Sequence, residues 1–117
     1  MASETPKISL EYDGNATIVT IADEKILEDE AIRLLQQSIM SVIDEGDHIC
    51  LVLDFQNVQF LSSAVLGLLI KISKRVHESD GQLRLCRINP KIYEVFKITR
   101  LTKTFDIYKD VDSAVGD

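Results

Sequence analysis

Apolar and polar residues alternate near the start of the chain, and this alternation predicts a β-hairpin. Ile8, Leu10 and Tyr12 are separated by polar residues, and a second run rich in Thr, Ile and Val extends from Ala16 to Ala22. The segment between them, Asp13-Gly14-Asn15, contains Asp-Gly, which accepts the positive φ values of tight hairpin turns. We therefore expect two antiparallel strands joined by this turn.

After residue 28 the hydrophobic period changes from two to three and four, which predicts a helix. From Asp29 onward the apolar positions form one broad helix face over about four turns. Gly46 is the residue expected to stop this helix, because glycine is common just past a helix end. The apolar face consists of Ile32, Leu35, Ile39, Val42 and Ile43.

The stretch from Ile49 to Ser79 is the one around which we expect the rest of the chain to be arranged. Its first residues are apolar on both faces up to Asp54, which is typical of a central strand covered on both sides. A short turn around Asn57 follows. A second helix then begins at Ser62 or Ser63, because a serine oxygen at an N-cap can accept a hydrogen bond from the first helical turn.

Two further strands and two short helices complete the pattern. Leu83 and Leu85 alternate with polar residues in a strand, and Asn89-Pro90 starts a short helix. A final strand is expected from Thr104 to Tyr108, followed by Asp112-Ser113-Ala114-Val115 as a brief terminal helix or a fraying end. The element order β-β-α-β-α-β-α-β-α predicts an α/β fold. Its mixed sheet is antiparallel at the leading hairpin, parallel where a helix crosses over, and packed against about four helices.

Composition and charge narrow the class of protein. With 117 residues, of which 45% are apolar and 27% charged, the chain has the composition of one ordinary folded domain over residues 1–117. The net charge of −6 and the scattered Lys and Arg residues argue against a nucleic-acid surface. No apolar run approaches the roughly 18 to 20 residues needed to span a bilayer, and no signal segment begins the chain. We therefore expect no membrane contact and a cytoplasmic protein.

The sequence offers little support for an enzyme or a metal protein. His48 and Cys50 share a strand face, but no second group of ligands accompanies them, so we expect no metal site and free thiols at Cys50 and Cys86. As a nucleophile, Ser63 would need a base, most often histidine, within ~3 Å, and neither histidine lies in a context that predicts this. Gly-rich phosphate loops and the GxSxG motif are absent. We expect no catalytic residue and no cofactor.

Two hydroxyls stand at the start of the central helix, where one would suffice for capping. They are bracketed by four apolar residues, more than one helix face can bury: Phe60, Leu61, Val65 and Leu66. A partly exposed apolar rim around a serine predicts a docking surface for another protein. The alternative is that these residues fill the core and that the serines only cap the helix.

The same stretch carries a resemblance to a known family. It reads Leu51-Val-Leu-Asp-Phe-Gln-Asn-Val-Gln-Phe-Leu-Ser-Ser-Ala-Val-Leu-Gly-Leu-Leu, a strand, an aspartate, a turn and a helix start with two hydroxyls. Further matches are Asp80-Gly81 before a strand, Asn89-Pro90 before a helix, Ile98-Thr-Arg-Leu101, and Phe105-Asp-Ile. In order and spacing these segments resemble a STAS domain, the module shared by sulfate transporters and anti-sigma factor antagonists, over nearly the whole chain.

The resemblance implies a site at the start of the central helix. Without a gap, the family's phosphorylated serine aligns with Ser63 and its motif aspartate aligns with Ser62. This departure from the family pattern makes Ser62 an alternative acceptor. The residues expected to bind a partner are Asp54, Phe60, Leu61, Ser62, Ser63, Val65 and Leu66.

The resemblance also implies a function, that of an anti-sigma factor antagonist in a partner switch. The unphosphorylated domain binds an anti-sigma factor that is also a serine kinase, and phosphorylation ends that binding. We expect the protein to be a monomer or a weak dimer. The alternative is a STAS scaffold that assembles with like domains and is not switched by phosphate. In size-exclusion chromatography a lone monomer would favour the switch, and a large assembly the scaffold.

Overall fold

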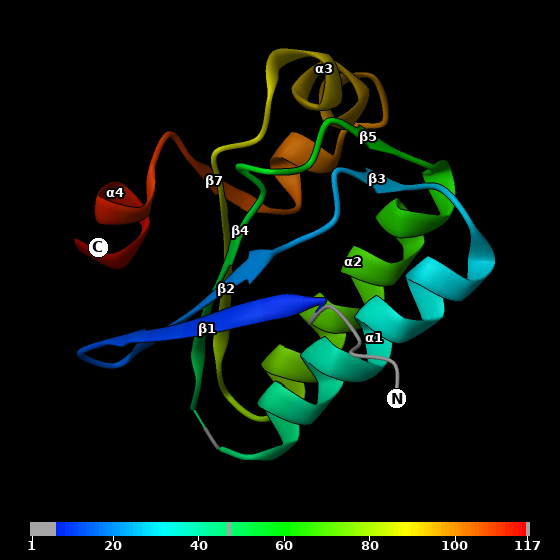
Figure 1. The fold of residues 1–117 in the computed structure, drawn as a ribbon. Coiled ribbons are helices and arrows are strands. Elements are labelled where there is room, and N and C mark those ends of the chain that lie inside the picture. Colours follow the sequence, from blue (N-terminus) through cyan, green and yellow to red (C-terminus); the bar gives the residue numbers. More distant parts are fainter. Residues whose placement is uncertain (1–6, 47, 117) are drawn as a thin grey trace.

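A five-stranded mixed sheet forms the centre of the computed structural model, which describes residues 7–46 and 48–116 (Figure 1). The strand order is β1-β2-β4-β6-β7. β1 and β2 pair antiparallel, and every later pair of neighbours in this sheet is parallel. The strands are β1 (Ile8–Asp13), β2 (Ala16–Ile21), β4 (Cys50–Asp54), β6 (Gln82–Cys86) and β7 (Asp106–Tyr108). The expected α/β fold with a leading antiparallel hairpin is confirmed.

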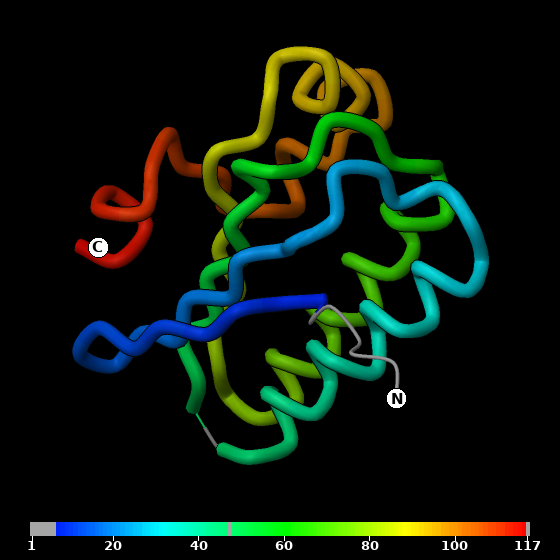
Figure 2. The backbone as a smooth tube through the Cα atoms, viewed as in Figure 1, coloured from blue at the N-terminus to red at the C-terminus, as the bar shows by residue number. Residues whose placement is uncertain are grey.

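The helices cover the two faces of this sheet unequally. α1 (Asp29–Asp44) and α2 (Ser63–Glu78) lie side by side over one face, and the short α4 (Val111–Gly116) lies against the other (Figure 2). α3 (Pro90–Ile98) lies beyond the end of the sheet. Its N-cap is Asn89, whose side chain accepts a hydrogen bond from the Ile92 N–H at 2.9 Å, as the Asn-Pro start of this helix predicts.

The main core lies between the sheet and the pair α1 and α2. The residues of the central strands that point to this side, such as Leu53 and Leu85, are fully buried. They meet the apolar stripes of the two helices, in which Ile39 and Ile72 are also fully buried. The three- and four-residue spacing seen in the sequence therefore does bury one face of each helix.

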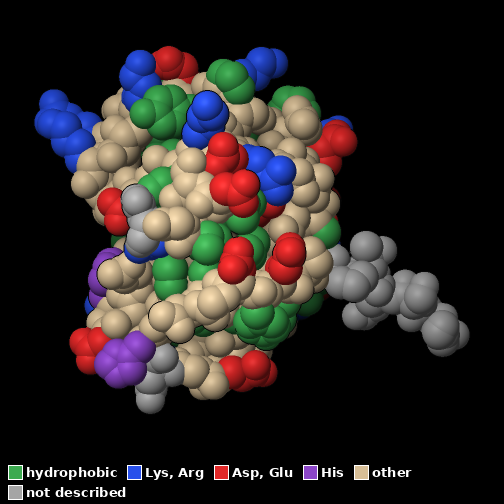
Figure 3. All heavy atoms as spheres, turned by 90° about the vertical axis from the view of Figure 1, so that its left-hand side faces the viewer, with side chains coloured by type: hydrophobic (Ala, Val, Ile, Leu, Met, Phe, Trp, Pro, Cys, Tyr) green, Lys and Arg blue, Asp and Glu red, His purple; other side chains and the backbone are tan. Residues whose placement is uncertain are grey.

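A smaller core lies under α4 on the opposite face of the sheet. Ile18, Val52 and Cys86 point to this side from three adjacent strands, and Ala114 of α4 covers them. In Figure 3, which shows the molecule from this side, hydrophobic side chains are visible between acidic ones. Both cysteines are free thiols, as expected. Burial, with a contribution from the charge of Asp54, raises the pKa of the Cys86 thiol to about 12, so this sulfur stays protonated at neutral pH.

A second sheet of two very short strands was not predicted. β3 (Lys25–Ile26) pairs parallel with β5 (Phe60–Leu61), and the pairing is extended by Ser62, whose N–H donates to the Ile26 carbonyl at 3.0 Å. A two-residue strand has no alternation to recognise, so the sequence pattern could not reveal it. The pairing matters because it anchors the chain immediately before α2.

The last strand is shorter than predicted. Thr104 and Phe105, which the sequence predicts as the start of this strand, instead lie in a turn that follows a short 3-10 helix (Leu101–Lys103). β7 begins only at Asp106. The Phe105 N–H donates to the Leu101 carbonyl at 3.0 Å, which keeps the chain turned until Asp106. Phe105 itself is buried and packs edge-on against Phe96 of α3, with 6.2 Å between the ring centroids.

Candidate functional site

The predicted docking region lies beyond the carboxyl end of β4, where β5, α2 and α3 come together (Figure 1). Ser63 is the first residue of α2 and is exposed. Ser62 is the residue before the helix, with the extended backbone typical of an N-cap (φ −89°, ψ 164°). The two hydroxyls therefore stand next to each other in sequence but in different surroundings.

Ser62 stands at the N-cap of α2, as the sequence predicts, but its hydroxyl makes no cap bond. Its Oγ is buried and has no hydrogen-bond partner, and α2 has no side-chain cap bond. The backbone N–H of Ser62 donates to the Ile26 carbonyl across the short sheet, and in this conformation the hydroxyl oxygen is shielded from solvent although the residue is half-buried. A buried hydroxyl without a partner costs about 1 to 3 kcal/mol, so this position is locally unfavourable.

Asp54 lies in the interior rather than on the docking surface. It is 1% exposed, and its carboxylate accepts two hydrogen bonds from the Arg87 guanidinium, one of them from Nε to Oδ1 at 3.0 Å. It also accepts the N–H of Gln56 at 3.0 Å and the hydroxyl of Thr20 at 3.4 Å. Asp54 thus holds the turn that leads from β4 to β5, and its effect on the site is indirect.

Arg87 is the partner that the sequence did not reveal. It follows β6 with a left-handed backbone (φ 55°), and its hydrogen bond to Asp54 raises the pKa of the guanidinium. A carboxylate at the end of a buried strand requires a compensating charge, which is a signal for an ion pair. The identity of the partner depends on the register of β4 and β6, in which Asp54 lies opposite Cys86, the residue before Arg87.

The predicted apolar rim divides into exposed and buried residues. Phe60 is 47% exposed and Leu61 is half-buried. Val65 and Leu66 are buried, because they lie on the side of α2 that packs into the core. The burial of these two side chains in the main core is what the core alternative expects.

The apolar surface extends instead toward β3 and α3. A shallow hollow of about 260 Å³ opens beside the start of α2. Leu27 and Val95, which border it, are substantially exposed, and the Nζ of Lys25 lies 5.8 Å from the centre of the Phe60 ring. The hollow is lined by Leu27, Gln59, Phe60, Leu61, Lys91, Ile92 and Val95. The α3 side of the hollow does not follow from the sequence pattern, because α3 meets β5 only through the tertiary fold.

The first turn of α2 carries no side chain that opposes an anion at Ser63. α2 has no acidic residue in its first turn, so its own side chains do not offset the partial positive charge at its N-terminus.

Within residues 7–46 and 48–116, no group of three or more His, Cys, Asp or Glu residues comes together as a metal site. In the same part of the chain, no helix has the length and apolar character to cross a membrane.

Residues 7–114 of the sequence match the STAS domain family, that is, nearly the whole of the fold described above. The chain belongs to the STAS domain family.

Three similar proteins put this STAS domain in context. The anti-sigma F factor antagonist of Paenibacillus polymyxa is 23% identical over 109 residues, which are 93% of this chain and 92% of the relative. The structure of an anti-sigma-factor antagonist (STAS) domain protein from Planctomyces limnophilus superposes with a TM-score of 0.83 at 18% identity, covering 92% and 93% of the two chains. SpoIIAA of Bacillus in its phosphorylated form superposes with a TM-score of 0.69 at 16% identity, covering 92% and 95%.

Proposed function

We propose that this STAS domain binds an anti-sigma factor that is also a serine kinase, and that phosphorylation of Ser63 ends the binding. The observation that carries the proposal is the contrast between the two serines. Ser63 is exposed at the first position of α2, whereas the Ser62 hydroxyl is enclosed. A kinase needs access to the hydroxyl oxygen, so the contrast favours Ser63 over the alternative acceptor Ser62.

Phosphate on Ser63 is compatible with an intact fold. It would add ≈ −1.5 to −2 charges at a helix N-terminus, where free N–H groups and the helix dipole stabilise anions. No acidic side chain in the first turn of α2 would repel it. SpoIIAA, which shares this fold, is known in a phosphorylated form, and this supports the proposal.

The same phosphate would weaken partner binding. The proposed docking surface consists of Phe60, Leu61 and the hollow that they share with Leu27 and α3. A dianion at the rim of this apolar surface must lose its hydration when a partner closes over it, and this desolvation opposes binding. Phosphorylation then changes the affinity for the partner while the protein remains folded.

The first experiment maps the phosphate. The purified protein is incubated with ATP and the serine kinase encoded in its own genome neighbourhood, and the modified residue is located by mass spectrometry. We expect phosphate on Ser63 of the wild type, none on Ser63→Ala, and unchanged modification of Ser62→Ala. If neither the wild type nor either variant takes up phosphate, the phosphorylation switch is excluded, and the alternative of a STAS scaffold that is not switched by phosphate is favoured.

A second measurement tests the coupling to binding. Ser63→Glu should weaken binding to the anti-sigma factor in calorimetry by at least tenfold, and Ser63→Ala should bind as tightly as the wild type. Glu78→Gln, at the far end of α2, is the matched control for a change of one charge. Equal affinities for Ser63→Glu and wild type would contradict the electrostatic explanation.

A further inference from the structure

The outer side of β1 is a second surface with the features of a binding edge. β1 lies at one edge of the sheet, and no segment in the described part of the chain pairs with its outer side. Two large apolar side chains on this strand are exposed, Leu10 by 43% and Tyr12 by 68%. An edge strand of this kind can extend its sheet by pairing with another strand.

The hydrogen bonds between β1 and β2 define which backbone groups face outward. The Ala22 N–H donates to the Lys7 carbonyl at 2.9 Å, and at the other end of the hairpin Asp13 lies opposite Ala16 across a two-residue turn. In an antiparallel pair, bonded and non-bonded positions alternate. The N–H and C=O groups of Ile8, Leu10 and Tyr12 are therefore directed away from β2, toward solvent.

We propose that β1 pairs antiparallel with β1 of a second copy of this protein, with Leu10 opposite Leu10 at the two-fold axis. In this register Ile8 lies opposite Tyr12 of the second copy. The outward N–H and C=O groups of these three residues then bond to the same groups of the other strand. The two sheets become one continuous sheet.

The sequence of β1 selects this register over its neighbours. A shift by one residue would set outward groups of one strand against inward groups of the other, and the bonds would be lost. A shift that centres the pair on Glu11 would set two carboxylates directly opposite each other, which is destabilising. A shift that centres the pair on Ser9 would place Tyr12 opposite position 6, which lies before the first residue of β1, so Tyr12 would have no partner within the strand.

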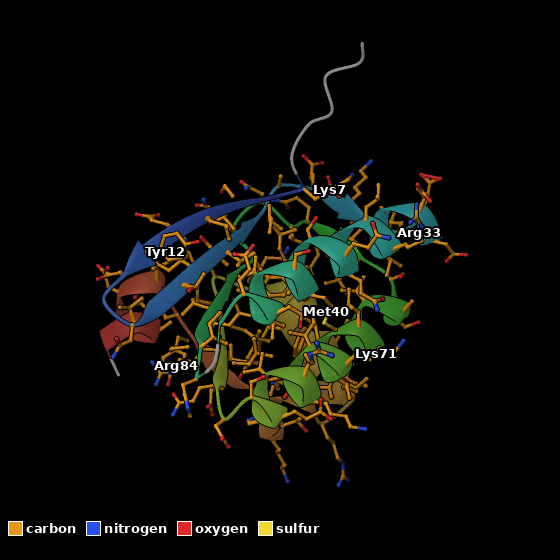
Figure 4. All side chains as sticks on the ribbon, turned by 90° about the horizontal axis from the view of Figure 1, so that it is seen from below. Lys7, Tyr12, Arg33, Met40, Lys71 and Arg84 are labelled. Carbon is orange, nitrogen blue, oxygen red and sulfur yellow. The ribbon has the colours of Figure 1, made fainter. Side chains whose placement is uncertain are left out.

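The side chains also match across the proposed pair. Ile8, Leu10 and Tyr12 point to the same side of the sheet as Val19 and Ile21 of β2, the side of the main core, so the two copies would form one apolar strip there. On the other side, Lys7 of each copy lies opposite Asp13 of the second. In Figure 4, Lys7 lies just before one end of β1 and Tyr12 lies toward the other end, next to Asp13 in sequence.

This complementarity favours a second copy over an unrelated strand. Lys7 and Asp13 have opposite charges at equal distances from Leu10, and only the same strand in reverse direction places each against its opposite. Lys7 already lies 3.2 Å from Asp23, and the second copy would bring a second carboxylate to this ammonium. The other edge strand, β7, has only three residues and packs against α4, so it offers no comparable edge.

The test combines sedimentation velocity with amide exchange measured by NMR. We expect the wild type to dimerise with increasing concentration. The amides of Ile8, Leu10 and Tyr12 should exchange fast in dilute protein and slowly in concentrated protein. The amides of Ser9 and Glu11, which face β2, should be protected at both concentrations.

Leu10→Arg places two like charges against each other at the two-fold axis, and it should raise the dimer dissociation constant at least tenfold. Ile98→Arg introduces the same charge at a 78% exposed position of α3 and should leave that constant unchanged. Circular dichroism checks that both variants fold. A wild type that stays monomeric at millimolar concentration would overturn the proposal. So would a dimer that Leu10→Arg does not weaken, or one that leaves the three outward amides unprotected.

Discussion

Asp54 and Arg87 depend on each other at the carboxyl ends of β4 and β6. The carboxylate is 1% exposed, whereas the Arg87 side chain is 39% exposed. Removing the arginine leaves a buried charge without compensation, which typically costs about 3 to 5 kcal/mol. Because this guanidinium is partly solvated, we expect Arg87→Met to lower the free energy of unfolding by a smaller amount, about 2 to 3 kcal/mol in urea titrations.

The matched variant for this prediction removes the buried charge as well. Asp54→Asn together with Arg87→Met should recover part of the stability lost in Arg87→Met alone, because the asparagine is neutral and can still accept from the Gln56 N–H. If the effects of the two substitutions simply add, the pair does not stabilise the turn in the way described.

Ser62 offers a test of the capping prediction itself. Replacing a serine that caps a helix by alanine lowers the free energy of unfolding of the protein by about 0.5 to 2 kcal/mol. The Ser62 hydroxyl is buried without a partner and makes no cap bond, so its removal relieves a desolvation cost. We expect Ser62→Ala to leave the free energy of unfolding unchanged or to raise it by up to about 1 kcal/mol in chemical denaturation. A clear loss of stability would mean that the hydroxyl does cap α2 in solution.

At the scale of elements, two glycines near the ends of α2 provide a matched pair. Gly81 lies immediately before β6, and a Cβ on it would lie 2.5 Å from the Ile49 carbonyl oxygen. Since that oxygen belongs to the backbone, Gly81→Ala should force a local shift and lower the free energy of unfolding by about 1 to 3 kcal/mol. Gly67 lies within α2, exposed, with no atom near the position of a Cβ. Gly67→Ala should therefore stabilise the protein by roughly 0.5 to 1 kcal/mol.

Thermal unfolding of the two alanine variants measures this difference directly. Opposite signs are expected for the two substitutions, although each adds the same methyl group. Equal shifts of the melting temperature would show that the close approach of Gly81 to Ile49 is relaxed in solution.

The elements that the sequence predicts well are those with a repeated pattern. The alternation of Ile8, Leu10 and Tyr12 and the helical stripe from Ile32 to Ile43 each involve several turns or residue pairs, so a single exception does not hide them. β3 and β5 have two residues each, and their pairing depends on the path of the chain between residues that are far apart in sequence. A local pattern cannot contain that information.

The candidate site shows the same division. The place of the two serines at a helix start follows from local rules, which favour serine at the N-cap that Ser62 occupies. The exposure of Phe60 and the burial of Val65 depend on how α2 is rotated against the sheet. Arg87 could be found only from the strand register, and the α3 side of the hollow only from the position of that helix beside β5.

At the scale of the whole molecule, net charge opposes the proposed association of two copies. Each copy has a formal charge of −6, whereas the attraction between Lys7 and Asp13 is confined to two exposed pairs. Exposed ion pairs contribute only about 0.2 to 1 kcal/mol each. The long-range repulsion is stronger at low ionic strength, since the Debye length is about 20 Å at 20 mM salt and about 8 Å at physiological ionic strength.

We therefore expect salt to tighten the dimer. Between about 20 mM and 0.2 M sodium chloride, the dissociation constant measured by sedimentation should fall by roughly three- to tenfold, because screening removes most of the repulsion between the two acidic copies. Lys7→Gln removes one positive charge from each copy and the attraction to Asp13, so this variant should dimerise more weakly and respond more strongly to salt. If added salt instead loosened the wild-type dimer, the association would depend on local ion pairs rather than on the backbone bonds and apolar strip of β1.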